Sequence, residues 1–248
     1  MTEEQRRGII WRKLARLETR AAPSLSTGFP ALDKLLGAGG LPRGAMVEWF
    51  GPPSSGKTTL ALQTSACLQA GGAVAAWVDA DRTFDPLYAA ALGVALDRLP
   101  VVQPETAEEA LEMAVQLVNS GALDLLIVDS AAALTPRLEL GASLVEAGGG
   151  LQGRVLASGL RKLGVALRRN AAAALFLNQT RAHPESGPGE SEASAGGSAL
   201  KLYSAVRIVF QPEAGGRLRL RALKGRAGAA LLPCVLERRE PSGFVEAR

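Results

Sequence analysis

The sequence has few of the residues that build disulfide frameworks and zinc sites. Among its 248 residues are two cysteines, Cys67 and Cys234, and a single histidine, His183. Two cysteines exclude a disulfide framework, and with only one histidine they cannot supply a Cys/His zinc site. We therefore expect any metal ion that this protein uses to be held by oxygen ligands.

Long apolar runs are also missing, and we expect no secretory leader. No stretch approaches the roughly 18 uncharged apolar residues of a membrane-spanning helix, and charged residues occur throughout the N-terminal segment. With 47% hydrophobic and 21% charged residues, the composition is typical of a soluble globular protein. We expect a cytoplasmic protein with no membrane partner. The net charge of +4 permits a polyanionic partner without requiring one.

The N-terminal segment differs from the rest of the chain. Ile10, Leu14 and Leu17 recur at helical spacing, which predicts a short amphipathic helix over residues 3–19. Residues 1–23 are therefore expected to form a helix and a linker. This segment either caps its own core or serves as an arm for oligomerisation or for a partner.

Residues 24–248 are expected to form one α/β domain. Apolar, strand-like runs alternate with helical segments, which predicts a mostly parallel, twisted sheet with helices on both faces. Two runs close together, 205–211 and 217–224, predict a C-terminal antiparallel hairpin. The other strands are expected over residues 46–50, 73–80, 124–130 and 173–180, and the helices over residues 58–70, 107–119 and 151–169.

Two segments depart from this alternation. Residues 138–151 are rich in glycine, and residues 180–197 contain a composition that disfavours both helix and strand. Long irregular segments inside a compact domain are uncommon and tend to be functional. Because both follow strand-like runs, we expect them at the carboxyl edge of the sheet, where ligands bind in this architecture.

Residues 51–59, with the sequence GPPSSGKTT, match the phosphate-binding loop known as the P-loop. They lie between a predicted strand and a predicted helix, as the mechanism requires. Gly51 and Gly56 let the backbone wrap around phosphate oxygens. Lys57 is expected to reach the β and γ phosphates, and the hydroxyl of Thr58 can ligate magnesium.

Polar residues at the ends of other predicted strands complete this candidate site. Asp129 ends the run LLIVD and is expected to orient the magnesium ion as the second carboxylate. Asp79, Asp81 and Gln179 are candidates for orienting or activating the water that hydrolysis needs. Gln179 closes an apolar strand at the shared carboxyl edge, which favours a contact with the γ-phosphate.

An ordered set of segments resembles the core of the bacterial RecA recombinase family. Together the segments extend over roughly residues 24–244. A phosphate-binding loop alone would not reproduce this order. The similar segments are residues 26–63, 79–94, 126–136, 160–167, 176–181 and 196–207.

The resemblance implies an ATPase that uses ATP and Mg²⁺. Gln179 would sense the γ-phosphate and couple it to the loop that follows, and Asp85 and Tyr88 would contact the adenine. Lys224 and Arg226 resemble paired lysines that reach the ATP of the adjacent protomer, which implies a homo-oligomer or filament. The residues implied to hold the triphosphate and the magnesium ion are Ser54, Ser55, Lys57, Thr58, Thr59 and Asp129.

The resemblance also implies binding to single-stranded DNA. The activity would then be a DNA-dependent ATPase in recombination, repair and the DNA-damage (SOS) response, with a repressor of that response as a protein partner. The two irregular segments would match the DNA-binding loops of the family. Arg154, Arg161 and Arg181 would face backbone phosphates, with Gly196 and Gly197 at the end of the second loop.

Four departures from the family pattern bear on these expectations. Asp81 stands where the family has its catalytic glutamate, and the shorter side chain predicts slow hydrolysis. Residues 180–197 are net acidic and lack aromatic residues, although single-strand binders usually combine basic grooves with stacking side chains. Leu202 replaces a phenylalanine of the subunit contact. The chain ends shortly after Phe244, so we expect the C-terminal domain of the family to be absent.

Two further functions compete with a recombinase. One is an accessory paralogue resembling the ImuA group, which partners a translesion DNA polymerase and has weak hydrolysis and weak DNA binding. The departures listed above favour that reading, and residues 1–23 would then be its partner-binding arm. The other is a P-loop kinase of small molecules, in which the ordered motifs would have no role.

Overall fold

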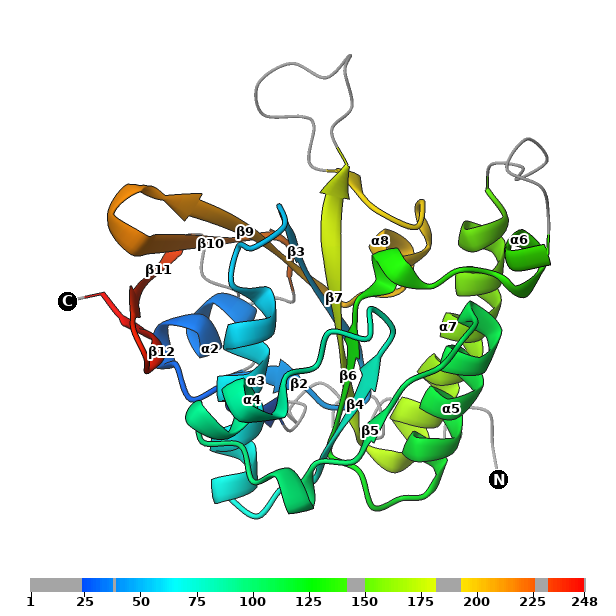
Figure 1. The fold of residues 1–248 in the computed structure, drawn as a ribbon, viewed down its shortest axis with the longest axis horizontal. Coiled ribbons are helices and arrows are strands. Elements are labelled where there is room, and N and C mark those ends of the chain that lie inside the picture. The colour runs from blue at the N-terminus through cyan, green and yellow to red at the C-terminus, as the bar shows by residue number, and fades with distance from the viewer. Residues whose placement is uncertain (1–23, 38, 142–149, 182–192, 226–231, 248) are drawn as a thin grey trace, which may run out of the picture.

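The computed structural model describes residues 24–37, 39–141, 150–181, 193–225 and 232–247. Over these residues the backbone forms one sheet of ten strands with helices on both faces (Figure 1) and a small two-stranded sheet. The predicted α/β class is therefore confirmed. None of the described helices is both long and apolar enough to cross a membrane. The predicted N-terminal helix and linker at 1–23 lie outside the described residues.

The centre of the large sheet is parallel, as the apolar runs predict. Its strands lie in the order β3, β7, β6, β4, β5. Because helices cover both faces, these strands are buried on both sides, and their sequences are nearly continuous apolar runs. Their bounds are β3 (Met46–Gly51), β4 (Ala75–Asp79), β5 (Val101–Val102), β6 (Leu125–Asp129) and β7 (Ala173–Arg181).

The helices form two layers with a separate apolar core on each face of the sheet (Figure 1). Alternate residues of one strand enter different cores: Trp77 of β4 packs in one and Val78 in the other. The first layer contains α2 (Pro30–Leu36), α3 (Lys57–Ala70) and α4 (Pro86–Ala91). The second contains α5 (Ala107–Asn119), α7 (Leu151–Asn170) and α8 (Ala199–Tyr203).

Antiparallel strands extend the sheet beyond β3. β9 (Val206–Glu213) pairs in parallel with β3 and antiparallel with β10 (Arg217–Lys224), so the predicted hairpin is confirmed. The sequence did not indicate the two strands that follow, β11 (Cys234–Arg239) and β12 (Gly243–Glu246). The separate small sheet pairs β1 (Ser24–Leu25) with β2 (Leu41–Pro42).

The two irregular segments are more ordered at their ends than predicted. At the start of the glycine-rich segment 138–151, the short helix α6 (Arg137–Gly141) forms. The backbone N–H of Arg137 donates to the Glu108 carboxylate of α5 at 2.9 Å, which anchors this short helix. The expectation of no strand in 180–197 is wrong, because β7 continues and pairs with β8 (Ala193–Ser194). Residues 142–149 and 182–192 lie outside the described ranges.

The packing of α5 on α7 yields a test of this fold. A Cβ atom added at Gly159 would lie 2.8 Å from the Cβ of Leu111, whereas one at Gly153 of the same helix would lie 3.6 Å from its nearest neighbour, the Gly196 carbonyl oxygen. Overpacking costs about 1–3 kcal/mol, and replacing a helical glycine by alanine gains about 1 kcal/mol. We expect Gly159→Ala to lower the urea midpoint of unfolding and the matched Gly153→Ala to raise it. The opposite ranking would contradict this packing.

Candidate nucleotide-binding site

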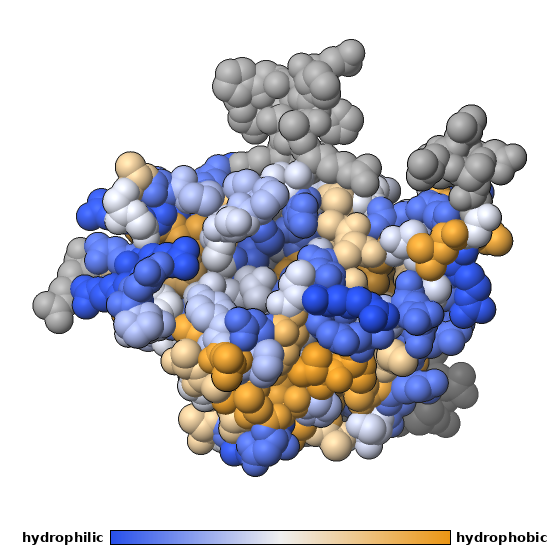
Figure 2. Space-filling view, in the orientation of Figure 1, coloured by the Kyte–Doolittle hydropathy of each residue, from blue (hydrophilic) through white to orange (hydrophobic). Residues whose placement is uncertain are grey.

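The carboxyl ends of the central strands meet at one edge of the sheet. Gly51 at the end of β3 pairs with Gln179 of β7, and Asp79 at the end of β4 pairs with Asp129 of β6. In Figure 2 this edge, at the top of the view, is largely hydrophilic, whereas apolar side chains gather on the lower part. The register therefore collects polar residues from separate motifs along one edge.

Residues 52–56 form the turn between β3 and α3, and the glycines at its ends have no space for a side chain. Gly56 has a φ of 88°, and an added Cβ would lie 2.4 Å from Cζ of Phe244. A Cβ on Gly51 would lie 2.6 Å from a carbonyl oxygen of β9. Ser54, which is exposed, also has a positive φ of 58°. Glycine freedom and close packing thus shape the predicted phosphate-binding loop.

Lys57 begins α3 directly after this loop. Its Nζ donates to the carbonyl oxygens of the last residue of β3 and the first residue of the loop, at 3.1 and 2.8 Å, and to Oγ of Ser55 at 3.1 Å. Burial lowers the pKa of Lys57 to about 8, although the carboxylates of Asp129 and Asp81 work against this shift. The ammonium group therefore remains largely charged at neutral pH, and three oxygen atoms of the loop and its first flanking residue surround it.

Thr58 and Asp129 bring two oxygen ligands together at the start of α3. Thr58 Oγ1 donates to Asp129 Oδ2 at 2.8 Å. Burial raises the pKa of Asp129 to about 6; the hydrogen bond from Thr58 opposes the shift, and the nearby carboxylates of Asp81 and Asp79 add to it. A hydroxyl and a carboxylate fit Mg²⁺, which usually takes one or two protein ligands and completes its shell with phosphates and water.

Asp79 and Asp81 make different hydrogen bonds in the structure. The Asp79 carboxylate accepts from the backbone N–H groups of Thr83 and Phe84 at 3.0 and 3.2 Å and from Gln103 Nε2 at 2.8 Å. It therefore holds the turn after β4. Asp81 instead accepts from the N–H and Oγ of Ser130, at 3.1 and 3.0 Å, next to Asp129.

Asp85 and Tyr88 lie at the start of α4. The Asp85 carboxylate caps this helix by accepting from the N–H groups of Leu87 and Tyr88 at 2.8 and 3.1 Å. The Tyr88 hydroxyl lies 2.9 Å from Thr59 Oγ1 on the P-loop helix. The two residues are thus joined to the predicted phosphate site, while their contact with adenine stays a prediction.

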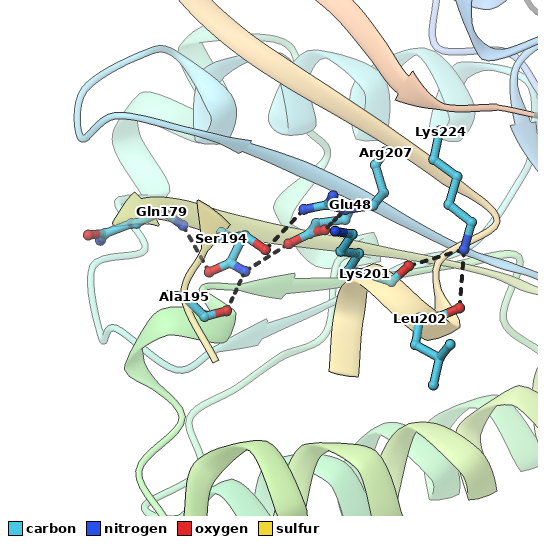
Figure 3. A network of polar contacts seen from close by, with 9 residues as sticks. Glu48, Gln179, Ser194, Ala195, Lys201, Leu202, Arg207 and Lys224 are labelled. Atoms are coloured by element: carbon cyan, nitrogen blue, oxygen red, sulfur yellow. Dashed lines mark hydrogen bonds and ion pairs between the residues drawn. The ribbon is translucent and has the colours of Figure 1, made fainter. Parts of the chain in front are cut away.

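Gln179 lies beside the first glycine of the P-loop because of the β3–β7 register. Its backbone N–H donates to Asn178 Oδ1 at 2.9 Å, and its carbonyl oxygen accepts from the N–H of Ala195 at 2.9 Å. Figure 3 shows its side chain pointing away from these contacts. Two hydrogen bonds therefore fix the backbone of Gln179 and leave its side chain pointing away from them.

The predicted DNA-binding residues lie on α7, at the end of β7 and in the segment that follows β8. Arg154 and Arg161 are exposed on that helix. Gly197 is exposed, and an added Cβ there would lie 3.9 Å from Cα of Gly153. Gly196 is buried against Leu156, whose Cδ1 would lie 2.8 Å from an added Cβ. The backbone of Arg181 ends β7, but its side chain lies outside the described part of the chain.

Lys224 occupies the end of β10. Its Nζ donates to the carbonyl oxygens of Lys201 and Leu202 at 3.1 Å each, at the end of α8 (Figure 3). Leu202, the predicted subunit-contact residue, is 71% exposed beside it. Arg226 lies outside the described residues. Lys224 thus hydrogen-bonds within its own chain at the end of α8, and its contact with an adjacent protomer stays a prediction.

Sequence reasoning missed three residues that support the site. The ring of Phe244 fills the space beside Gly56. Gln63 donates to the carbonyl oxygen of Phe244 at 3.0 Å and accepts from its N–H at 2.8 Å, which fixes β12 on α3. Ser130 holds Asp81. No local pattern marks the first two, whereas the position of Ser130, directly after the strand-ending Asp129, was a usable signal.

Together the parallel sheet, the P-loop and the Thr58–Asp129 pair define a P-loop nucleotide-binding protein with a RecA-type core. The chain belongs to the RecA family: the family model described as the RecA N-terminal domain matches residues 6–215. The resemblance of the ordered sequence motifs is thereby confirmed.

Several proteins named Protein RecA are similar to this chain. The one from Parvibaculum lavamentivorans is 50% identical over 185 residues, which are 75% of this chain and 51% of that protein. The one from Acidiphilium cryptum is 46% identical over 202 residues, 82% of this chain and 59% of that protein. The one from Clostridioides difficile is 44% identical over 196 residues, 79% of this chain and 56% of that protein. The chain thus spans little more than half the length of these relatives.

The raised pKa of Asp129 predicts that its charge destabilises the metal-free protein. Because the pKa of this carboxyl is higher in the folded state than in the unfolded state, the protein loses stability as the pH rises from 3.8 through about 6. We expect Asp129→Asn to raise the free energy of unfolding at pH 7.5 by about 1–3 kcal/mol. The gain should vanish below pH 4, as measured by urea unfolding in chelator.

Asp124 provides the matched control. Burial acts against its charged form, but hydrogen bonds from Val74 and Arg43 and the charge of Arg43 lower its pKa overall. Asp124→Asn should therefore destabilise the protein at pH 7.5, with the loss disappearing as pH falls through the folded pKa. Equal destabilisation by both substitutions at pH 7.5 would contradict the electrostatic description of the site.

Proposed function

We propose that this protein is a DNA-dependent ATPase that binds ATP with Mg²⁺ and single-stranded DNA and acts in recombination, repair and the DNA-damage response. One observation carries the proposal. The P-loop with its Thr58–Asp129 pair lies in register beside Gln179, at the strand end that leads toward the candidate DNA-binding residues. Membership of the RecA family supports the same reading.

Each residue of the edge has a chemical role in this proposal. The ammonium of Lys57 and the N-terminus of α3 would bind the β and γ phosphates. Thr58 and Asp129 would hold magnesium, which when bound neutralises charge that develops on the phosphate oxygens. Asp81 would orient the attacking water, and the Gln179 side chain would contact the γ-phosphate.

Single-stranded DNA would lie along the start of α7. Arg154 and Arg161 are seven positions apart on one helix, so they project from nearly the same face. Both are exposed, and Gly197 lets a phosphate approach the backbone beside them. These contacts would supply the electrostatic part of binding independently of base sequence. The exposed Leu202 and Lys224 are proposed contacts to a neighbouring copy in a homo-oligomer or filament.

The accessory role with a translesion polymerase gains no support here. Its proposed partner arm, residues 1–23, lies outside the described part of the chain. Binding of a repressor likewise stays a prediction of the sequence, because no described contact bears on it.

The DNA-binding proposal predicts binding that depends on ATP and falls with salt. Replacing both Arg154 and Arg161 by alanine should weaken binding at every sequence. It should also reduce the slope of log affinity against log salt by about 1.4, since each lost phosphate contact contributes about 0.7 on single strands. Fluorescence anisotropy of a labelled oligonucleotide would measure this.

Arg238→Ala is the matched control, because Arg238 is an exposed arginine on β11, on the antiparallel extension of the sheet beyond β3. It should leave both affinity and slope unchanged. An intact protein that binds ATP but not DNA at low salt would contradict the proposal. Equal effects of the α7 and β11 substitutions would contradict the proposed position of the DNA along α7.

Asp81 limits the expected rate of hydrolysis. Its carboxylate is one methylene shorter than a glutamate and is drawn toward Ser130. A misplacement of about 1 Å can cost on the order of 100-fold in rate. We expect Asp81→Glu to raise phosphate release in the presence of DNA by up to that factor, and Asp81→Asn to lower it. Unchanged turnover in Asp81→Glu would contradict the proposal that Asp81 orients the attacking water.

A further inference from the structure

A buried ion pair joins β3 to β9 just inside the carboxyl edge (Figure 3). Glu48 is fully buried and Arg207 retains 5% of its exposure. Arg207 Nε donates to Glu48 Oε2 at 2.5 Å, and the guanidinium lies 4.5 Å from the ring centroid of Phe50. Glu48 interrupts an otherwise apolar strand, and Arg207 lies in the buried first half of β9, so solubility cannot account for them.

The ion pair holds the chain where it returns toward α8. We call residues 194–195 the returning segment. Arg207 Nη2 donates to Ser194 Oγ at 3.1 Å. The second oxygen of Glu48 accepts from Asn178 Nδ2 at 2.9 Å, and the same amide donates to the carbonyl oxygen of Ala195 at 3.0 Å. One carboxylate thus fixes the returning segment through two routes.

The same network fixes the backbone of Gln179. Asn178 Oδ1 accepts from the N–H of Gln179 at 2.9 Å, and Ala195 donates its N–H to the Gln179 carbonyl oxygen at 2.9 Å. In register, Gln179 also pairs with Gly51 of the P-loop. One strand position therefore joins the phosphate-binding loop to the returning segment, which leads directly into Gly197.

Stability alone does not explain this pair. Replacing a buried ion pair by apolar residues of similar volume is often neutral or stabilising, whereas removing one partner is strongly destabilising. What apolar residues cannot reproduce is the direction of the contacts. Glu48 accepts from Asn178, and Arg207 donates to Ser194. An apolar pair in their place would lose both of these directional contacts.

We infer that Glu48 and Arg207 are positioning residues that hold the returning segment beside Gln179. Through this hydrogen-bond network, nucleotide at the P-loop and single-stranded DNA at Gly197 change each other's affinity, because both ligands act on the backbone that the network holds at Gln179. The inference rests on the proposed function, since it names the link between the two proposed sites.

The test uses the full chain with Glu48→Leu and Arg207→Met combined. The matched control is Glu213→Leu with Arg219→Met, which removes a partly exposed ion pair of the β9–β10 hairpin by the same exchanges. Affinity for a fluorescent ATP analogue should stay within about 2-fold in both proteins. The factor by which ATP tightens binding of a labelled oligonucleotide should fall on the order of 10-fold in the first protein only.

Amide hydrogen exchange provides a readout that does not depend on DNA. The Ala195 N–H, which donates to Gln179, should exchange about 10-fold faster in the Glu48→Leu/Arg207→Met protein than in the unmodified and control proteins. Ser194→Ala, which removes one contact and keeps the ion pair, should show a smaller change in the same direction. If the double variant does not fold, the exchange measured in Ser194→Ala provides the test.

Unchanged exchange at Ala195 together with unchanged coupling would overturn the inference. If ATP does not alter oligonucleotide binding in the unmodified protein, the proposed function fails; the exchange at Ala195 still decides whether Glu48 and Arg207 position the returning segment. A double variant that loses affinity for the ATP analogue as severely as for DNA would also overturn the inference, because that result indicates a general structural role of Glu48 and Arg207.

Discussion

The parallel register of the central strands is the constraint on which the whole site depends. Pairing of Gly51 with Gln179 and of Asp79 with Asp129 places residues from distant parts of the sequence along one line. A slip of one residue would turn each side chain to the other face of the sheet. The geometry of the site is therefore set by the backbone hydrogen bonds of the sheet, and the loops supply its chemical groups.

Burial gives the site its electrostatic character. It moves the pKa of Lys57 down to about 8 and that of Asp129 up to about 6, so both charged forms are disfavoured by the same cause. A ligand that carries phosphates and a divalent cation would relieve both effects, because each partial desolvation is then matched by an opposite charge. The two residues expected to bind phosphate and magnesium are thus ones whose charged forms the unliganded fold disfavours.

The sequence predicted the parts of the structure that depend on local pattern. The P-loop, Asp129 and the central strands follow from spacing and apolar runs, and the hairpin follows from two adjacent runs. β12 and the β7–β8 pair could not be predicted in this way, because β12 is held by hydrogen bonds to Gln63 of the distant helix α3 and β8 is only two residues long. The resemblance had singled out Asp81, but the hydrogen bonds of Asp79 to Gln103 and of Asp81 to Ser130 could not be predicted, since they join positions distant in sequence.

The contact of Phe244 with Gly56 has a consequence for how the protein is made. The hydrogen bond from Gln63 to Phe244 joins residues 181 positions apart, and it seats β12 against the helix that begins at the P-loop. During synthesis the P-loop therefore emerges long before the ring that packs against it. A ribosome-bound chain that contains the P-loop but not yet residue 244 lacks this contact, so the loop reaches its packed conformation only after β12 has been made.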